Sequence, residues 1–134
     1  RLMSDQFKLE IVNPEKSFLL KDDVTEVIIP AYEGEMGILK DHISLISFLK
    51  PGLIKIFSKG AEDRFFVEDG IVEFKDNSLS ILTSSIFNIK DSDKNYINNT
   101  ISESEKELSN DEIDDQKRFL LNHKIEVLKS LSIN

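Results

Sequence analysis

The strongest constraint on the fold of this chain is the distribution of its helix-breaking residues. All five glycines and all three prolines lie in the first 90 residues, and the 44 residues from Asp91 to Asn134 contain neither. Helix interiors tolerate glycine and proline least, and tight turns use them most. The sequence therefore predicts two parts, a turn-rich domain over 6–88 and a helical domain over 91–134.

The first part has the period of β-strands. Short apolar runs alternate with polar residues and are separated by turn residues, a pattern typical of strands. The runs recur every eight to twelve residues, and this spacing favours an antiparallel β-sandwich or flattened barrel, here of about eight to ten strands. The turn signals are Asn13-Pro14, Pro51-Gly52, Lys59-Gly60, Asp69-Gly70 and Asp76-Asn77.

The second part is predicted to form two helices joined by a short polar link, which makes an antiparallel hairpin. The first helix has only a thin apolar stripe, so its contact with the second is expected to be weak. The second helix is expected to take its N-cap from Ser109 or Asn110, with Glu112 in capping-box spacing. The expected stripes are Ile97, Ile101 and Leu108 in the first helix, and Ile113, Leu120, Val127, Leu128 and Leu131 in the second.

Composition argues against several classes of function. The formal net charge is -8, whereas a nucleic-acid groove needs a basic face. The chain has no cysteine and only two histidines, His42 and His123, which stand far apart without metal-ligand spacing, so neither a disulfide nor a metal site is expected. No apolar run approaches the length that spans a bilayer, so any membrane association is expected to depend on a partner.

Two groups of charged residues each allow more than one functional interpretation. Glu33 and Glu35 flank Gly34 in a predicted polar loop, where they could solubilise a turn, dock a partner or form a catalytic pair. Catalysis would need a pocket and a second catalytic group, and the sequence shows neither. The bases Lys117, Arg118, Lys124 and Lys129 fit a solvated helix face, or a detachable helix that docks on an acidic partner.

Several motifs in a fixed order identify a resemblance. Phe7-Lys8-Leu9-Glu10-Ile11-Val12 is followed by Pro14-Glu15, Glu33-Gly34-Glu35-Met36-Gly37-Ile38-Leu39, His42, Lys50-Pro51-Gly52-Leu53-Ile54-Lys55-Ile56 and Gly70-Ile71-Val72-Glu73. In this order and spacing the chain resembles the epsilon subunit of the bacterial F-type ATP synthase, which is called delta in mitochondria. The resemblance runs from about Phe7 to the C-terminus.

The resemblance implies a non-catalytic subunit with a β-sandwich followed by a helical hairpin. It implies a place at the foot of the central stalk, where the subunit attaches the gamma subunit to the membrane c-ring and couples ion flow to the catalytic alpha-beta head. The expected location is the cytoplasmic face of the bacterial inner membrane, as a peripheral protein. The coupling ion, H+ or Na+, stays open.

The resemblance also implies roles for individual residues. Glu35 and His42 are expected to dock on the c-ring, with Glu33, Gly34 and Met36 shaping the loop. The hairpin is expected to inhibit ATP hydrolysis, with Lys117, Arg118 and Lys124 meeting an acidic segment of the beta subunit. Some relatives bind ATP through a motif at the start of the hairpin; here Asp93 is kept but Tyr96 stands in place of the arginine. Neither a nucleotide site nor any other cofactor is therefore expected.

A different class of function stays open as the alternative. The chain could be a free-standing β-sandwich module that binds a ligand or a protein and carries a helical tail. This alternative predicts a concave pocket lined by aromatic residues, although burial in strands already explains many of the nine phenylalanines. An enzyme is a third interpretation.

Overall fold

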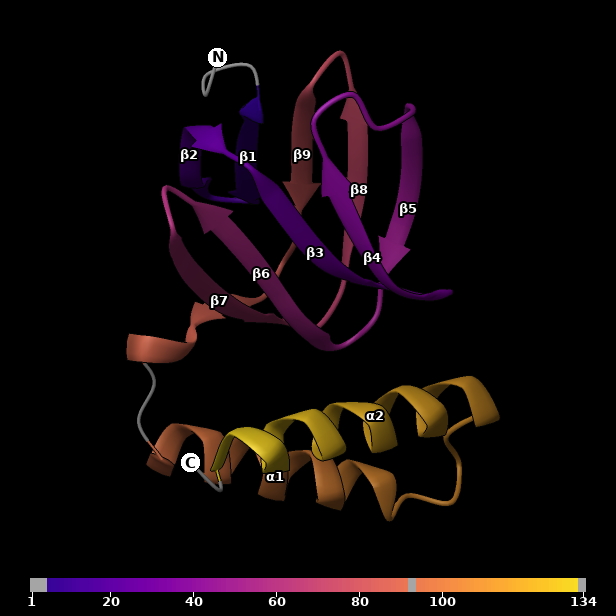
Figure 1. Ribbon diagram of the computed structural model, residues 1–134. Coiled ribbons are helices and arrows are strands. Elements are labelled where there is room, and N and C mark those ends of the chain that lie inside the picture. The colour runs from indigo at the N-terminus through magenta and orange to yellow at the C-terminus, as the bar shows by residue number, and fades with distance from the viewer. Residues whose placement is uncertain (1–4, 92–93, 133–134) are drawn as a thin grey trace. The chain divides into compact units, whose positions relative to one another are not determined.

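The computed structural model describes residues 5–91 and 94–132. The chain separates into two compact units, Arg1–Asn88 and Ile89–Asn134. The first unit is built from strands and the second mainly from two helices (Figure 1). The predicted class, a β-sandwich of about eight to ten strands followed by a two-helix hairpin, is confirmed.

Ten strands form the first unit in a single hydrogen-bonded order, β10-β7-β6-β3-β5-β8-β9-β1-β2, with β4 on the other side of β3. All pairs are antiparallel except β1 with β9, which is parallel, so the predicted antiparallel sandwich contains one parallel pair. The strands are β1 (Phe7–Asn13), β2 (Lys16–Val24), β3 (Glu26–Ala31), β4 (Gly34–Leu39), β5 (Leu45–Leu49), β6 (Gly52–Ser58), β7 (Ala61–Val67), β8 (Gly70–Lys75), β9 (Ser78–Leu82) and β10 (Ile86–Asn88).

The order divides into two layers at one weak junction. Strands β3 and β5 share only the pair Ala31 and Leu49, so the sheet folds over at this point. Alternate residues of the strands then face a common core. Phe7 and Phe74 meet there edge to face, with ring centroids 5.6 Å apart. The core residues are Phe7, Leu9, Ile11, Val24, Val27, Ile29, Ala31, Ile38, Leu49, Ile54, Ile56, Phe65, Val67, Val72, Phe74, Leu79 and Ile81.

Two predicted turns have the backbone that tight hairpins need. Lys59 and Gly60 have φ values of 51° and 77°, and Asp76 and Asn77 have 52° and 58°. Positive φ at both central residues matches the right-handed twist of the flanking strands, and glycine and asparagine adopt it at little cost. These two turns therefore fix the registers of β6 with β7 and of β8 with β9.

The prediction of a polar loop around Gly34 is wrong. Residues 34–39 are strand β4, which pairs with β3 from Ala31 opposite Gly34 to Glu26 opposite Leu39. Only Tyr32 and Glu33 form the turn, and Gly34 absorbs the reversal with a φ of 132°. Pro30 lies inside β3, one residue before the strand ends at Ala31.

The second unit contains a short 3₁₀ helix, η2 (Ile89–Asp91), followed by α1 (Lys94–Leu108) and α2 (Asp115–Ser132). The predicted buried positions Ile97 and Ile101 are confirmed on α1. On α2 the buried set is Leu121, Ile125 and Leu128, so the predicted stripe is wrong except at Leu128. Leu120, Val127 and Leu131 are half-buried, and Ile113 lies in the link before the helix.

The helix also begins later than its capping pattern predicted. Asp114 is the N-cap of α2, since its carboxylate accepts a hydrogen bond from the amide of Lys117 at 2.7 Å. Ser109 instead donates its hydroxyl to the carbonyl of Lys106 at the end of α1, at 2.6 Å. Asn110 closes a local turn by accepting from the amide of Glu112, at 2.9 Å. Neither predicted cap therefore starts α2.

Candidate docking surfaces

The described residues include no group of three or more histidine, aspartate and glutamate side chains placed to hold a metal ion. Neither α1 nor α2 is long and apolar enough to cross a bilayer. Glu33 and Glu35 are both exposed, and Glu35 pairs with Lys55 at 3.8 Å. The features that remain are surfaces for contact with another molecule.

One such surface is an apolar groove of about 830 Å³ on the strand unit. Five large apolar side chains around it are exposed to between 43% and 69%. Glu33, Asp69 and Ser84 add a polar margin to it. Contiguous exposed apolar surface of this kind marks a site of contact with another macromolecule or a ligand. The large apolar residues are Tyr32, Ile46, Phe48, Ile71 and Leu82.

The groove owes its form to strands with apolar residues on both faces. In β5, Leu49 is buried in the core while its neighbour Phe48 points outward. Gly70 keeps the floor of the groove low, because a Cβ atom there would lie 2.9 Å from the carbonyl oxygen of Leu82 and 3.0 Å from Leu49. A side chain at position 70 would therefore push these strands apart.

Sequence reasoning missed the outward apolar residues of the groove. It assigned the apolar residues of the strands to a single core. A signal was present, since Leu45, Ile46, Phe48 and Leu49 leave only Ser47 polar within β5. A strand with one solvated face should alternate, and a nearly continuous apolar run indicates that both faces are covered.

The turn between β3 and β4 lies at one margin of this groove. Tyr32 and Glu33 form the turn and also line the groove. Glu35 follows on β4 with its side chain 65% exposed, while Met36 points toward the core, where it is partly buried. The structure thus brings Glu33, Gly34 and Glu35 together at one hairpin tip, with Met36 packed beneath it.

His42 lies at the opposite end of β4. About 13 Å of extended strand separate Glu35 from Leu39, and His42 follows in the next turn, where its amide donates to the carbonyl of Leu39 at 3.1 Å. Its half-buried ring packs edge-on against Phe74, with centroids 6.0 Å apart. The sequence suggested that Glu35 and His42 share one loop, but they do not.

A pair of turns is tied together beside His42. The amide of Asp41 donates to the side-chain oxygen of Asn77 at 2.7 Å, and the Asn77 side-chain nitrogen donates back to the Asp41 carboxylate at 3.0 Å. Asp41 holds a φ of 67°. We call this contact the Asp41–Asn77 clamp. It links the turn after β4 to the turn between β8 and β9, and sequence reasoning did not find it.

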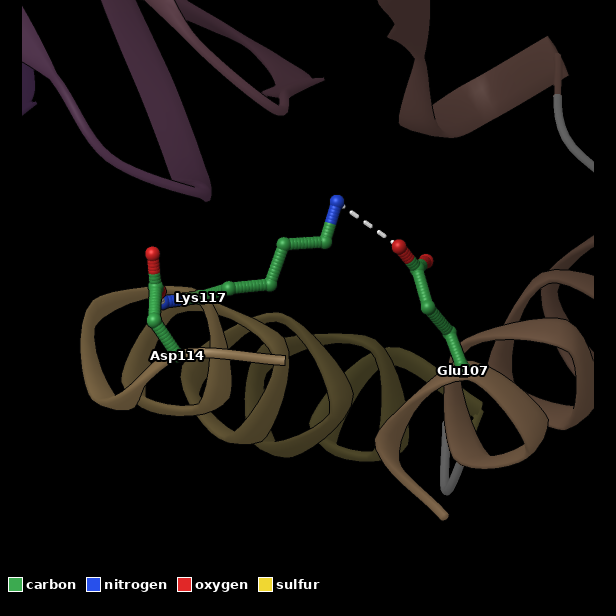
Figure 2. Close-up of polar contacts among 3 residues, drawn as sticks. All are labelled: Glu107, Asp114 and Lys117. Carbon is green, nitrogen blue, oxygen red and sulfur yellow. Dashed lines mark hydrogen bonds and ion pairs between the residues drawn. The ribbon is translucent and has the colours of Figure 1, made fainter. Parts of the chain in front are cut away.

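The predicted basic residues of α2 are engaged within the hairpin. Lys117 Nζ lies 2.7 Å from a carboxylate oxygen of Glu107 (Figure 2). Arg118 donates from its guanidinium group to the carbonyl oxygen of Leu108 at 3.1 Å, which caps the last turn of α1. Lys124 is half-buried further along α2. The structure thus places Lys117 and Arg118 at the C-terminal end of α1.

The segment compared with a nucleotide-binding motif is only partly described. Asp93 lies outside the described residues. Tyr96 lies on the first turn of α1 with half of its side chain exposed, and it carries no cationic group for a phosphate. The interpretation that this segment has no phosphate-binding charge stays a prediction.

Comparison with known proteins gives one consistent family. A family model described as ATP synthase, Delta/Epsilon chain, beta-sandwich domain, matches residues 6–89. A protein of Pelagibacter ubique named ATP synthase epsilon chain is 66% identical over 130 residues, which cover 97% of this chain and 100% of that protein. A protein of Sinorhizobium fredii with the same name is 34% identical over 102 residues, 75% of each chain.

The fold is also found in solved complexes. A chain from the cryo-EM structure of the Euglena gracilis mitochondrial ATP synthase, OSCP/F1/c-ring, matches with a TM-score of 0.74. The match covers 96% of this chain and 80% of that chain at 21% identity. At this identity the match supports the fold.

Proposed function

This chain belongs to the delta/epsilon chain family of ATP synthase, and on that premise we propose that it joins the gamma subunit to the membrane c-ring. It is a non-catalytic subunit of the synthase. In this role it holds parts of the rotor together while ions cross the membrane and ATP is made in the alpha-beta head. The partners hold it at the cytoplasmic face of the bacterial inner membrane.

The apolar groove is the observation that carries the proposal. Its five large apolar side chains lie on the outer surface of the strand unit, where water would otherwise cover them. Burying such residues supplies most of the free energy of a stable interface. We assign the groove to the gamma subunit, because interfaces between subunits that stay together permanently are large and apolar.

Substitution of groove residues tests this assignment. Ile46→Asp with Phe48→Asp places two charges in the interface, so binding to purified gamma subunit should weaken by about 100-fold or more. Ile43→Asp is the matched control, because Ile43 is 78% exposed and does not line the groove. Titration calorimetry measures both variants. Equal affinity of the double variant and the control would contradict the assignment.

The tip of the β3–β4 hairpin is proposed as the contact with the c-ring. Glu35 is exposed there next to Gly34, and Glu33 stands at the turn itself. Charged residues at the rim of an interface set its register and its association rate. Met36 supports the tip from the core side. His42 is proposed as a second c-ring contact, separated from the first by the length of β4.

Two single variants test these contacts separately. Glu35→Lys should weaken co-assembly with the c-ring in a reconstituted complex, because it reverses the charge at the tip. His42→Ala should also weaken co-assembly, because it removes the second proposed c-ring contact at the far end of β4. Quantitative mass spectrometry of the assembled complex measures both. Undiminished assembly with Glu35→Lys would contradict the role of the tip.

The helical hairpin is proposed to inhibit ATP hydrolysis. In this proposal α2 leaves α1 and brings Lys117, Arg118 and Lys124 to an acidic segment of the beta subunit. The few buried apolar residues of the hairpin support it, because a small buried area makes opening inexpensive. A chain ending at Lys90 should raise ATP hydrolysis by the assembled complex. An unchanged rate would show that the hairpin does not inhibit.

A free-standing ligand-binding module is the alternative function. The groove contains two aromatic residues, Tyr32 and Phe48, as such a module would need. It lies outside the sandwich, however, whereas small ligands are usually enclosed on most of their surface. Affinity purification from native membranes separates the two functions. Recovery with gamma and c-ring subunits supports the rotor joint, and recovery of the chain alone supports the module.

A further inference from the structure

The helical hairpin has a small apolar contact of its own. Its described buried apolar residues are Ile97 and Ile101 on α1 and Leu121, Ile125 and Leu128 on α2. The third buried residue of α1 is Ser104, whose hydroxyl donates to the Thr100 carbonyl at 2.8 Å. A contact this small keeps the free energy of closing the hairpin modest, so a small polar contribution can shift the balance between closed and open.

Two ion pairs cross from α1 to α2. Lys117 lies 2.7 Å from Glu107, and Lys129 lies 3.3 Å from Glu105. In a helix the side chains lean toward the N-terminus, so side chains of two antiparallel helices lean in opposite directions and can meet across the pair. Both acids thus lie in the last turn of α1, and both bases come from α2.

We infer that Glu105 and Glu107 act as an internal competitor for the basic residues of α2. In the closed hairpin these two carboxylates occupy Lys117 and Lys129. The acidic partner segment of the proposed function needs the ammonium group of Lys117, so the closed hairpin and the docked α2 exclude each other at this residue. The inference rests on the proposed function for the identity of the partner, which is an acidic segment of the synthase head.

The two ion pairs stabilise the closed hairpin only weakly, because both are exposed. The four side chains are 45% to 58% exposed, and exposed pairs contribute little each because water and salt screen them. Removing one pair should therefore change the ratio of open to closed hairpin by about two- to fivefold. A change of this size is enough to regulate, and it would not lock the hairpin in either state.

The N-terminal cap of α2 stays intact when the ion pair between Lys117 and Glu107 is removed. Asp114 accepts its hydrogen bond from the backbone amide of Lys117, so a new side chain at position 117 leaves this cap in place (Figure 2). Glu107→Gln therefore removes the ion pair without changing the cap of α2.

The decisive experiment compares Glu107→Gln with Lys117→Gln in the full chain. Both remove the same ion pair, so both should raise the open-to-closed ratio by about two- to fivefold. The chain has no cysteine, so cysteines introduced at the exposed positions Asn98 and Ser130 carry two spin labels whose separation reports opening. Glu103→Gln is the matched control, since the described residues include no ion pair of Glu103. It should leave the separation unchanged.

The same variants should differ in the assembled synthase. Glu107→Gln keeps the base and loses its competitor, so ATP hydrolysis should fall further below the wild-type rate. Lys117→Gln loses a base that docks on the partner, so hydrolysis should stay at or above the wild-type rate. The charge swap Glu107→Lys with Lys117→Glu should close the hairpin again and raise hydrolysis.

Separate results overturn the inference and the proposed function. If Glu107→Gln and Glu103→Gln leave the same label separation, the carboxylates do not hold the hairpin and the inference is wrong. If Glu107→Gln opens the hairpin but hydrolysis is unchanged, the internal contact stands and the inhibitory function fails. If both glutamine variants shift hydrolysis in the same direction, the competition for Lys117 is refuted.

Discussion

Two buried hydroxyl groups in the strand unit differ in their hydrogen bonding. Ser47 is buried in β5 between the outward Ile46 and Phe48, and its hydroxyl has no hydrogen-bond partner within the described residues. Thr83 is equally buried, but its hydroxyl donates to the carbonyl of Asp69 at 2.7 Å. The two residues make a natural comparison of an unsatisfied and a satisfied buried hydroxyl.

Removing these two hydroxyls should have opposite effects. Ser47→Ala should leave the free energy of unfolding unchanged or raise it by about 1 kcal/mol, because an unpaired buried hydroxyl is costly. Thr83→Val keeps the shape and should lower it by about 1–3 kcal/mol. Urea unfolding measures both variants. A larger loss for Ser47→Ala than for Thr83→Val would show that Ser47 has a stabilising partner.

The Asp41–Asn77 clamp gives a second prediction for single side chains. Asn77→Gly keeps a residue that accepts positive φ but removes both hydrogen bonds to Asp41. It should lower the free energy of unfolding by about 0.5–1 kcal/mol, and the amide hydrogen of Asp41 should exchange faster. Asp76→Gly in the same turn is the control. Equal exchange of the Asp41 amide in both variants would mean that the clamp does not order the turn before His42.

At the scale of elements, strands were predictable and their outer faces were not. Turn residues such as Lys59-Gly60 and Asp76-Asn77 determine local backbone geometry, so the succession of strands along the chain could be predicted. Which face of β5 is covered depends on a partner, and the local sequence encodes that only as a run without alternation. The parallel pairing of β1 with β9 joins residues far apart in sequence and left no local signal.

The start of α2 was mispredicted for a related reason. Ser109, Asn110 and Asp114 all have side chains that can cap a helix. The choice among them depends on where α2 must begin for Leu121 and Ile125 to reach α1. Packing between the helices therefore decided which of these residues became the cap.

Substitution of the cap tests this explanation. Asp114→Ala removes the acceptor for the amide of Lys117 and should destabilise the helical unit by about 0.5–2 kcal/mol. Ser109→Ala is the control and should cost less, since Ser109 only bonds to the last turn of α1. Circular dichroism during urea unfolding measures both. A larger loss of stability for Ser109→Ala than for Asp114→Ala would mean that Ser109 is the N-cap of α2 after all.

At the scale of the whole molecule, the two units differ in how firmly they are built. The strand unit has one core that includes residues of most of its strands. The hairpin has two helices, a short apolar contact and exposed ion pairs. This difference suits a protein in which one unit holds two partners at fixed places while the other changes state. The proposed docking residues are the part that the sequence indicates least, because a contact with another chain leaves only exposed residues in this one.

The central claim is that separate places on the strand unit meet the gamma subunit and the c-ring. A photo-crosslinking amino acid placed singly at Phe48, which lines the groove, or at Glu35, which does not, tests it most directly in the assembled synthase. Mass spectrometry then identifies the captured subunit. We predict capture of the gamma subunit from position 48 and of the c-ring from position 35. Capture of neither, or of the same subunit from both positions, would contradict the account.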